Sequence, residues 1–413
     1  MRRLLGPALL VVGGVAVALI ALEIGLRVLY PQVGIFARHD VLGMAPRAGL
    51  DIRKAYGSHE RVVRVSTNSL GLREAELGPP PADALRVLAV GDSMTFGDAV
   101  EQDEAWPRQL AAALSAAAGG RRVAAVNAGI GGYGTGQELL LYRMLRDRVR
   151  PEVVVLGLSA VNDLLDNLCI EEASYRPKSN APCFRLERGD LILHPVRHED
   201  PPAEASPLSF RSRVVEFFTA QAKRATVWNP QLASLLRTAG VVKGLPYVPG
   251  TIASWYDPKL SEPGWELTRR LLLEFRATVE RDGARLLVLL IPSSVQLDPG
   301  KVRLLQILGG DSAAVQAYLA DPDRPQRLVA AFCEESGLAC VDLLPALREA
   351  KGRGETLFFP IDQHLTPAGH RLAARLLAGR IAELGWIDER PAVAGRPAPM
   401  AGLPGPPAGE GRR

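Results

Sequence analysis

The sequence predicts an α/β fold: a three-layer, flavodoxin-like sheet of about five parallel strands with helices on both faces. Two observations support this fold. Short apolar runs alternate with longer helical segments along the chain. Polar or glycine-rich loops follow several of these runs, as expected at the carboxyl edge of a parallel sheet, where ligands bind. The hydrophobic content of 47% is ample for a buried core.

The first predicted strand of the sheet covers 85–91 and leads into Asp92 and Ser93. A helix is expected from about 104–106 to about 118. A serine on such a turn lies at the carboxyl edge of the sheet, and backbone N–H groups there point to where an oxyanion would develop. Because Gly-Asp-Ser is also an ordinary turn, a role for Ser93 depends on partners elsewhere in the chain.

A second strand is predicted over 122–127, followed by the glycine-rich segment 128–136 and a helix over 137–149. Glycines let the backbone approach a ligand closely. A phosphate-binding loop is the competing interpretation, but the lysine and Ser/Thr of a P-loop are missing. A tight turn without a ligand is the remaining alternative.

A third strand is predicted over 152–158 and leads into Asn162 and Asp163. The Asn162 carboxamide can donate a hydrogen bond toward the same crevice as Ser93. An Asn-Asp pair after a strand is otherwise a common helix cap.

The segment 164–263 interrupts the β-α rhythm, and we expect it to form an insertion over the carboxyl edge of the sheet. His194 and His198 lie within it, four positions apart. Pro195 stands between them and no acidic residue completes a metalloprotease motif, so surface histidines are favoured over a metal site.

The β-α rhythm then resumes and ends in a loop that carries Asp362 and His364. Thr366 and Pro367 are typical of a helix start, and this last helix should run to about 384. The intervening elements are predicted as a helix over 265–282, a strand over 285–291, a helix over 326–336 and a strand over 338–342.

The amino end predicts a membrane anchor over 1–30. Leu4–Leu22 is uncharged and long enough to cross the bilayer, and the preceding arginines favour a cytoplasmic start with an extracytoplasmic, periplasmic remainder. A cleaved signal peptide is the alternative. We expect a linker or small accessory β region over 31–84, the main domain over 85–388 and a disordered tail over 389–413.

The net charge of +4, with arginines spread along the chain, gives no indication of nucleic-acid binding. The four cysteines lack CxxC spacing, which disfavours a zinc site. If the chain is exported, Cys169–Cys183 and Cys333–Cys340 are the pairs closest in sequence, although spacing alone does not fix connectivity.

Taken together, four blocks make the chain resemble the SGNH (GDSL-type) hydrolases. The blocks are Gly91-Asp92-Ser93, Asn127 to Gly132, Val161-Asn162-Asp163 and Asp362-Gln363-His364. Two of them depart from the usual pattern: Val161 stands where the family often has glycine, and Asp-x-His replaces Asp-x-x-His. The shorter spacing is similar to that of the alginate acetyltransferase-like branch, and His370 is the alternative base.

The resemblance implies that Ser93, His364 and Asp362 form a catalytic triad. It also implies an oxyanion hole made by the Ser93 and Gly132 backbone N–H groups and the Asn162 side chain. Asp92 is expected to brace the turn, and no metal or organic cofactor is required. The implied function is a serine esterase for acyl, foremost acetyl, esters of cell-envelope or exported polysaccharide. The alternatives are a polysaccharide O-acetyltransferase and a silent carbohydrate-binding module; oligomeric state is not predicted.

Overall fold

The computed structural model describes residues 2–29, 34–56, 60–79, 81, 83–117, 121–169, 181–196, isolated positions between 212 and 238, 248–309 and 312–388. His198, much of the expected insertion and the expected tail over 389–413 lie outside these residues.

A five-stranded parallel sheet forms the centre of the molecule, in the order β11-β10-β7-β5-β6. Its strands are β5 (Leu85–Gly91), β6 (Val123–Gly129), β7 (Val153–Ser159), β10 (Arg285–Ile291) and β11 (Ala339–Asp342). Counted along the chain, this is the flavodoxin-like order 2-1-3-4-5. The predicted α/β sheet is therefore confirmed, and each predicted strand lies within two residues of its observed bounds.

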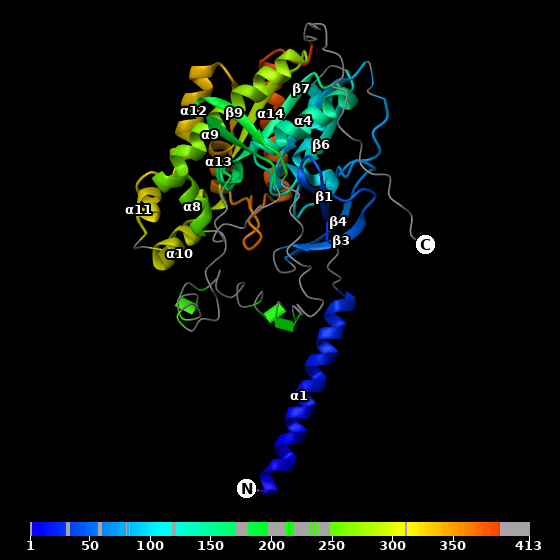
Figure 1. The fold of residues 1–413 in the computed structure, drawn as a ribbon, viewed down its shortest axis with the longest axis vertical. Helices are drawn as coiled ribbons and strands as arrows, with labels where there is room; N and C mark the ends of the chain where they lie inside the picture. The colour runs from blue at the N-terminus through cyan, green and yellow to red at the C-terminus, as the bar shows by residue number, and fades with distance from the viewer. Residues whose placement is uncertain are drawn as a thin grey trace.

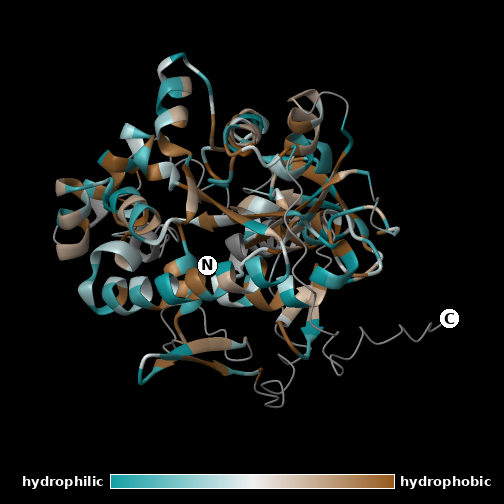
Figure 2. Cartoon of the chain, turned by 90° about the horizontal axis from the view of Figure 1, so that it is seen from above, coloured by the Kyte–Doolittle hydropathy of each residue, from teal (hydrophilic) through white to brown (hydrophobic). Residues whose placement is uncertain are grey.

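Helices cover both faces because side chains alternate along each strand. In β5, Leu88 and Val90 pack into the core on one face of the sheet, beneath helices α4, α9 and α12. Val87 and Ala89 pack into the core on the other face, beneath α3, α13 and α14. Figure 2 shows hydrophobic residues on the central strands and hydrophilic residues on the outer helices. The helices of these two layers are α3 (Trp106–Ala117), α4 (Thr135–Val149), α9 (Pro258–Arg281), α12 (Arg324–Ser336), α13 (Leu344–Gly352) and α14 (Pro367–Glu383).

Several shorter helices were not expected from the sequence. They are α2 (Ser93–Phe96), α5 (Asp163–Asn167), α8 (Val248–Tyr256), α10 (Pro299–Gly309) and α11 (Ala313–Ala320), with 3₁₀ turns η1 (Gln102–Glu104) and η2 (Ser294–Gln296). Helix α9 also begins two turns before the predicted start at Trp265. Asp257 caps it by accepting from the Lys259 N–H at 3.0 Å, and Pro258 occupies its first position.

The region before the sheet folds into two antiparallel hairpins, β1 (Phe36–His39) with β2 (Gly43–Pro46) and β3 (Asp51–Tyr56) with β4 (Arg61–Ser66). Val63 and Val65 of β4 pack with Phe96 and Ala99 in a separate apolar cluster. The accessory region is therefore packed directly against the segment that follows Ser93.

Arg73 ties this region to the same segment. Its side chain is fully buried and donates to the carbonyl oxygens of Gly97 at 2.6 Å and Val100 at 2.7 Å. It also donates to the carbonyl of Arg64 on β4 at 2.9 Å and to that of Phe96 at 3.3 Å. One guanidinium thus satisfies carbonyls of the accessory hairpin and of the loop after α2 together.

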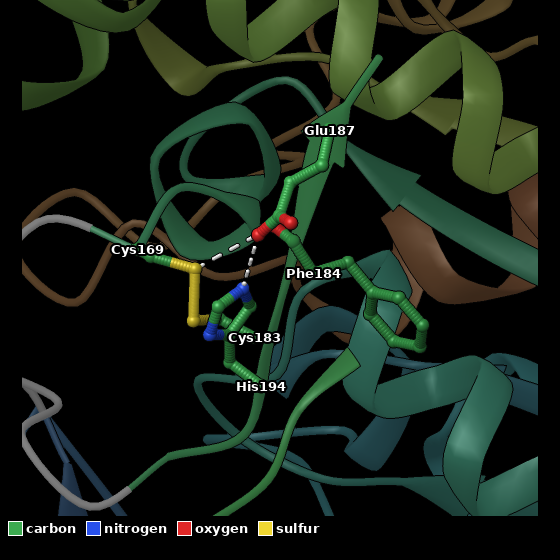
Figure 3. Close-up of a disulfide and its surroundings, with 5 residues drawn as sticks. All are labelled: Cys169, Cys183, Phe184, Glu187 and His194. Atoms are coloured by element: carbon green, nitrogen blue, oxygen red, sulfur yellow. Dashed lines mark hydrogen bonds and ion pairs between the residues drawn. A yellow bond between two sulfur atoms is a disulfide. The ribbon is translucent and has the colours of Figure 1, made fainter. Parts of the chain in front are cut away.

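Two disulfides join the cysteine pairs that are closest in sequence, Cys169–Cys183 and Cys333–Cys340, as expected. The first anchors the hairpin of β8 (Cys183–Glu187) and β9 (Asp190–His194). Figure 3 shows Phe184 pointing away from this disulfide; the ring lies in the core, where a Cβ at Gly136 of α4 would approach it to 2.9 Å.

Helix α1 (Arg2–Leu29) projects away from the α/β body (Figure 1). Within the part of the chain that the structure describes, no helix combines the length and the apolar character needed to cross a membrane.

Replacing Arg73 with methionine should lower the free energy of unfolding by about 3–5 kcal/mol, because it leaves buried carbonyls without their charged donor. Urea denaturation measures the change. Arg122→Met is the matched control, since Arg122 pairs with Asp83 on the surface and its loss should cost under about 1 kcal/mol. Equal effects of the two substitutions would contradict the structural role of Arg73.

Candidate active site

The register of the central strands brings three loops to one place. Gly91 at the end of β5 pairs with Gly129 of β6 on one side and with Gly157 of β7 on the other. The strand order reverses at β5, so these loops open at the topological switch point of the sheet. Ser93, the glycine-rich loop and Asn162 therefore emerge from neighbouring strand ends.

The three paired glycines leave room for α2 to lie directly against the sheet. A Cβ at Gly91 or Gly157 would meet the Thr95 Oγ1 atom at 2.1 or 2.4 Å. A Cβ at Gly129 would meet the Phe96 nitrogen at 2.2 Å. Any side chain at these positions would push α2, and Ser93 with it, away from the strand ends.

Asp92 caps α2, as expected for a residue that braces the turn. Its carboxylate accepts from the Met94 N–H at 2.8 Å. The side chain is almost completely buried, and this burial raises the pKa of Asp92 to about 6, against the hydrogen bond from Met94 and the nearby His364.

His364 connects Ser93 and Asp362, although Ser93 lies 271 positions from it in the sequence. The His364 Nε2 atom is 2.8 Å from Ser93 Oγ, and Nδ1 is 2.5 Å from Asp362 Oδ1. A carboxylate only accepts hydrogen bonds, so the Nδ1–H donates to Asp362 and Nε2 accepts from the serine hydroxyl. This geometry suits proton removal from Ser93.

The carboxylates around His364 set its protonation. Burial alone would lower the pKa of His364, but the hydrogen bond and charge of Asp362, with the charges of Asp98 and Asp92, raise that pKa above 6.5. Because the pKa of His364 is higher in the folded state than in the unfolded state, its protonation stabilises the fold. This contribution is complete below pH 6.5 and is lost as the pH rises through the folded-state pKa.

The shortened Asp-x-His spacing is accommodated by the conformation of Gln363. This residue has a φ of +69°, a region that non-glycine residues rarely occupy. Its Oε1 atom accepts from Ser294 Oγ at 3.0 Å, and Ser294 Oγ in turn lies 3.0 Å from Lys301 Nζ. Burial lowers the pKa of Lys301 to about 8, although Asp298, Glu60 and Asp362 oppose this shift. The network holds Gln363 in its strained conformation.

Glu60, from the turn between β3 and β4, holds the same loop from the opposite end. Its Oε2 atom accepts the backbone N–H groups of Ile361 at 3.1 Å and Asp362 at 2.9 Å. The accessory region therefore contributes directly to the placement of Asp362, a role that the sequence did not indicate.

The two remaining expected oxyanion donors, Gly132 and Asn162, follow β6 and β7, the two strands that flank β5. A Cβ built at Gly131 would be 3.6 Å from the Ser93 Cβ, which places the glycine loop against the serine. Gly132 follows with a φ of +81°. Asn162 Nδ2 donates to Asp166 Oδ2 at 2.5 Å; an amide nitrogen carries two hydrogens, so this bond uses one of the two donors.

His370, the alternative base, belongs to the protein interior. It is completely buried in α14, and its Nδ1 atom accepts the Trp106 backbone N–H at 3.1 Å. Burial, with the charges of His364 and Arg73, lowers the pKa of His370 to about 3. His370 is therefore neutral and anchors α3 to α14.

His194, which the sequence analysis weighed as a metal ligand, lies at the end of β9. Its Nε2 atom is 3.1 Å from Glu187 Oε1 in the same hairpin (Figure 3). Its expected neighbour His198 lies outside the described residues. Across the residues that the structure describes, no group of three or more His, Cys, Asp or Glu side chains is arranged to hold a metal ion.

The sequence did not identify the polar residues that surround Ser93 and His364. Asp98 Oδ2 is 4.0 Å from His364 Nε2, and Tyr56 of β3 donates to Asp98 Oδ1 at 2.5 Å. The only local signal for Asp98 is its position immediately after the Gly-Asp-Ser turn and α2. Tyr56 and Glu60 are brought to the site by tertiary packing, which has no local sequence pattern.

Residues 89–372 match the family model described as "GDSL-like Lipase/Acylhydrolase family". No curated protein matches the sequence. Among solved structures, the crystal structure of TesA is 16% identical with a TM-score of 0.36, covering 72% of this chain and 98% of TesA. A variant of Axe2, an acetyl xylan esterase from Geobacillus stearothermophilus, is 13% identical with a TM-score of 0.33, covering 73% of this chain and 96% of Axe2.

Replacing Asp362 with asparagine should lower the pKa of His364, because the adjacent negative charge that favours the imidazolium is removed. Titration of the His364 ring signals by NMR measures this change. Asp83→Asn, at an exposed position, should leave the titration unaltered. A His364 pKa that is the same in the wild type and in Asp362→Asn would show that the two side chains do not interact in solution.

Proposed function

The chain belongs to the GDSL-like lipase/acylhydrolase family, so it is an SGNH-type ester hydrolase, and we propose that Ser93, His364 and Asp362 are its catalytic triad. The observation that carries this proposal is the single imidazole placed 2.8 Å from Ser93 Oγ and 2.5 Å from Asp362 Oδ1. The arrangement is that of a nucleophile, a base and the group that orients the base.

In this mechanism Ser93 Oγ attacks the ester carbonyl carbon while its proton moves to His364 Nε2. The tetrahedral oxyanion receives hydrogen bonds from the Ser93 and Gly132 backbone N–H groups and from Asn162. The bond from the carbonyl carbon to the alcohol oxygen then breaks, and His364 gives its proton to that oxygen. Water repeats the sequence on the acyl-enzyme, releasing the acid and restoring Ser93. Each oxyanion donor contributes about 3–4 kcal/mol to the transition state.

For the substrate we propose an acetyl ester of an exported or cell-envelope polysaccharide. The acetyl group is supported by the Asp-x-His spacing at Asp362 and His364, which resembles that of the alginate acetyltransferase-like branch. The polysaccharide is supported by the proposed location outside the cytoplasm. Comparing the hydrolysis rates of p-nitrophenyl acetate, butyrate and octanoate tests the acyl preference; faster cleavage of the longest chain would refute it.

We propose an extracytoplasmic, periplasmic location, with the amino-terminal segment as a membrane anchor. Two disulfides support export, because such bonds persist in oxidising compartments. The uncharged stretch Leu4–Leu22 behind two arginines supports an anchor. Protease added to intact spheroplasts should digest the catalytic domain and spare cytoplasmic proteins. A catalytic domain that survives this treatment as cytoplasmic proteins do would refute the topology.

A polysaccharide O-acetyltransferase is the second candidate, favoured by the same Asp-x-His spacing and expected anchor. Both activities share the acyl-enzyme and differ in whether water or a sugar hydroxyl attacks it. The partition between free acetate and acetylated acceptor, measured with an acetyl donor and added oligosaccharide, separates them. Transfer that exceeds release would favour the transferase.

Replacing Ser93 with alanine should reduce kcat/KM for p-nitrophenyl acetate by about 10⁴–10⁶-fold, since it removes the nucleophile. A fluorophosphonate should label the wild type at Ser93 and leave this variant unlabelled. The matched control is Ser115→Ala on the exposed side of α3, which should hydrolyse the ester at the wild-type rate. Full activity in Ser93→Ala would show that another residue is the nucleophile.

A further inference from the structure

A second carboxylate, that of Asp98, faces the triad and is not used in the mechanism above. Its side chain is 16% exposed. The Oδ1 atom accepts from Tyr56 at 2.5 Å and lies 3.9 Å from Lys54 Nζ. The Oδ2 atom lies 4.0 Å from His364 Nε2 and, within the described part of the chain, accepts no hydrogen bond.

The backbone holds Asp98 firmly in this place. The Asp98 N–H donates to the Ser93 carbonyl at 3.1 Å, and the preceding Gly97 closes α2 with a φ of +82°. The buried Arg73 binds the Gly97 carbonyl. Oδ2 is therefore a fixed acceptor close to the nucleophile.

The chemistry places the alcohol part of the ester beside Oδ2. His364 Nε2 must give its proton to the leaving alcohol oxygen, which therefore lies within hydrogen-bond reach of Nε2. Because Oδ2 is 4.0 Å from Nε2, groups on the carbon next to the one that bears this oxygen come within reach of Oδ2. A carboxylate accepts only, so it favours substituents that carry a donor.

We propose that Asp98 Oδ2 binds a hydroxyl group on the carbon next to the one that bears the ester oxygen, so that the site selects esters of polyhydroxylated alcohols. This inference rests on the proposed triad and narrows its substrate class. The hydrogen bond from the hydroxyl to a carboxylate is charge-assisted, which makes it stronger than one between neutral groups.

The surroundings of Asp98 favour a neutral hydroxyl over a cationic substituent such as a choline ammonium. Lys54 Nζ lies 3.9 Å from Asp98 Oδ1 and 4.1 Å from the centre of the Tyr56 ring. This positive charge partly balances Asp98 and repels a second cation.

An apolar wall completes the space. A Cβ built at Gly131 would lie 3.6 Å from the Ser93 Cβ, 3.8 Å from Asp98 Oδ2 and 3.8 Å from the Phe36 Cζ atom. The nucleophile, the acceptor and an aromatic edge thus converge at Gly131. An apolar surface next to one fixed polar group suits a ring that carries hydroxyls.

The test uses two esters that differ by one hydroxyl: trans-2-hydroxycyclohexyl acetate and cyclohexyl acetate. The wild type should cleave the hydroxylated ester with a kcat/KM about 10–100-fold higher. In Asp98→Ala this ratio should fall to about one, and in Asp98→Asn, which retains an acceptor for Tyr56, it should take an intermediate value. Asp51→Asn, at the exposed far end of β3, should keep the wild-type ratio.

The ratio separates recognition from a general effect, because loss of the charge next to His364 slows both esters together. A wild-type ratio near one, a ratio unchanged in Asp98→Ala, or a preference for acetylcholine over the hydroxylated ester would overturn the proposal. Failure of the triad itself is recognised separately: the wild type would then cleave neither ester and would not be labelled by a fluorophosphonate at Ser93.

Discussion

The imidazole of His364 is the contact on which this structure depends. It lies between a serine near residue 90 and a carboxylate two positions before itself, and both ring nitrogens are engaged. Both contacts require the end of the first strand of the sheet and the loop before the last helix to hold a fixed position relative to each other. Helices α3 and α14 provide that link, since His370 of α14 accepts the backbone N–H of Trp106 at the start of α3.

Each side of the triad is held by buried polar groups. On the serine side, Asp92 caps α2 and Arg73 satisfies the carbonyls that follow it. On the histidine side, Glu60 and the network of Ser294 and Lys301 hold the Asp-x-His loop. Buried polar groups stabilise a structure only when they are paired, so these contacts also define one geometry for the site.

The sequence was sufficient for the parts of the fold that follow regular patterns. The strands and the larger helices have clear periodicity, and Ser93, Asp362 and His364 come directly before or after such elements. The sequence was insufficient where tertiary contacts decide. Nothing local marks Glu60 or Tyr56 as neighbours of His364. The left-handed conformation of Gln363 likewise occurs in a loop that distant residues, Ser294 and Glu60, hold through hydrogen bonds. The first two turns of α9 lie inside the segment expected as an insertion over 164–263, and the helix continues through Pro263 because Asp257 and Pro258 form a good cap.

The accessory hairpins determine where this enzyme can be truncated without disturbing the site. The boundary suggested by composition, near residue 84, would separate Ser93 and His364 from Glu60, Arg73 and Tyr56, whose hydrogen bonds hold the loops around them. The hydrolase core is thus not an autonomous module to which a spacer has been attached. A shortened enzyme, or a chimaera with a related hydrolase, needs to retain the chain from about Ile35 onward, because residues before the sheet pack against the segment that follows Ser93.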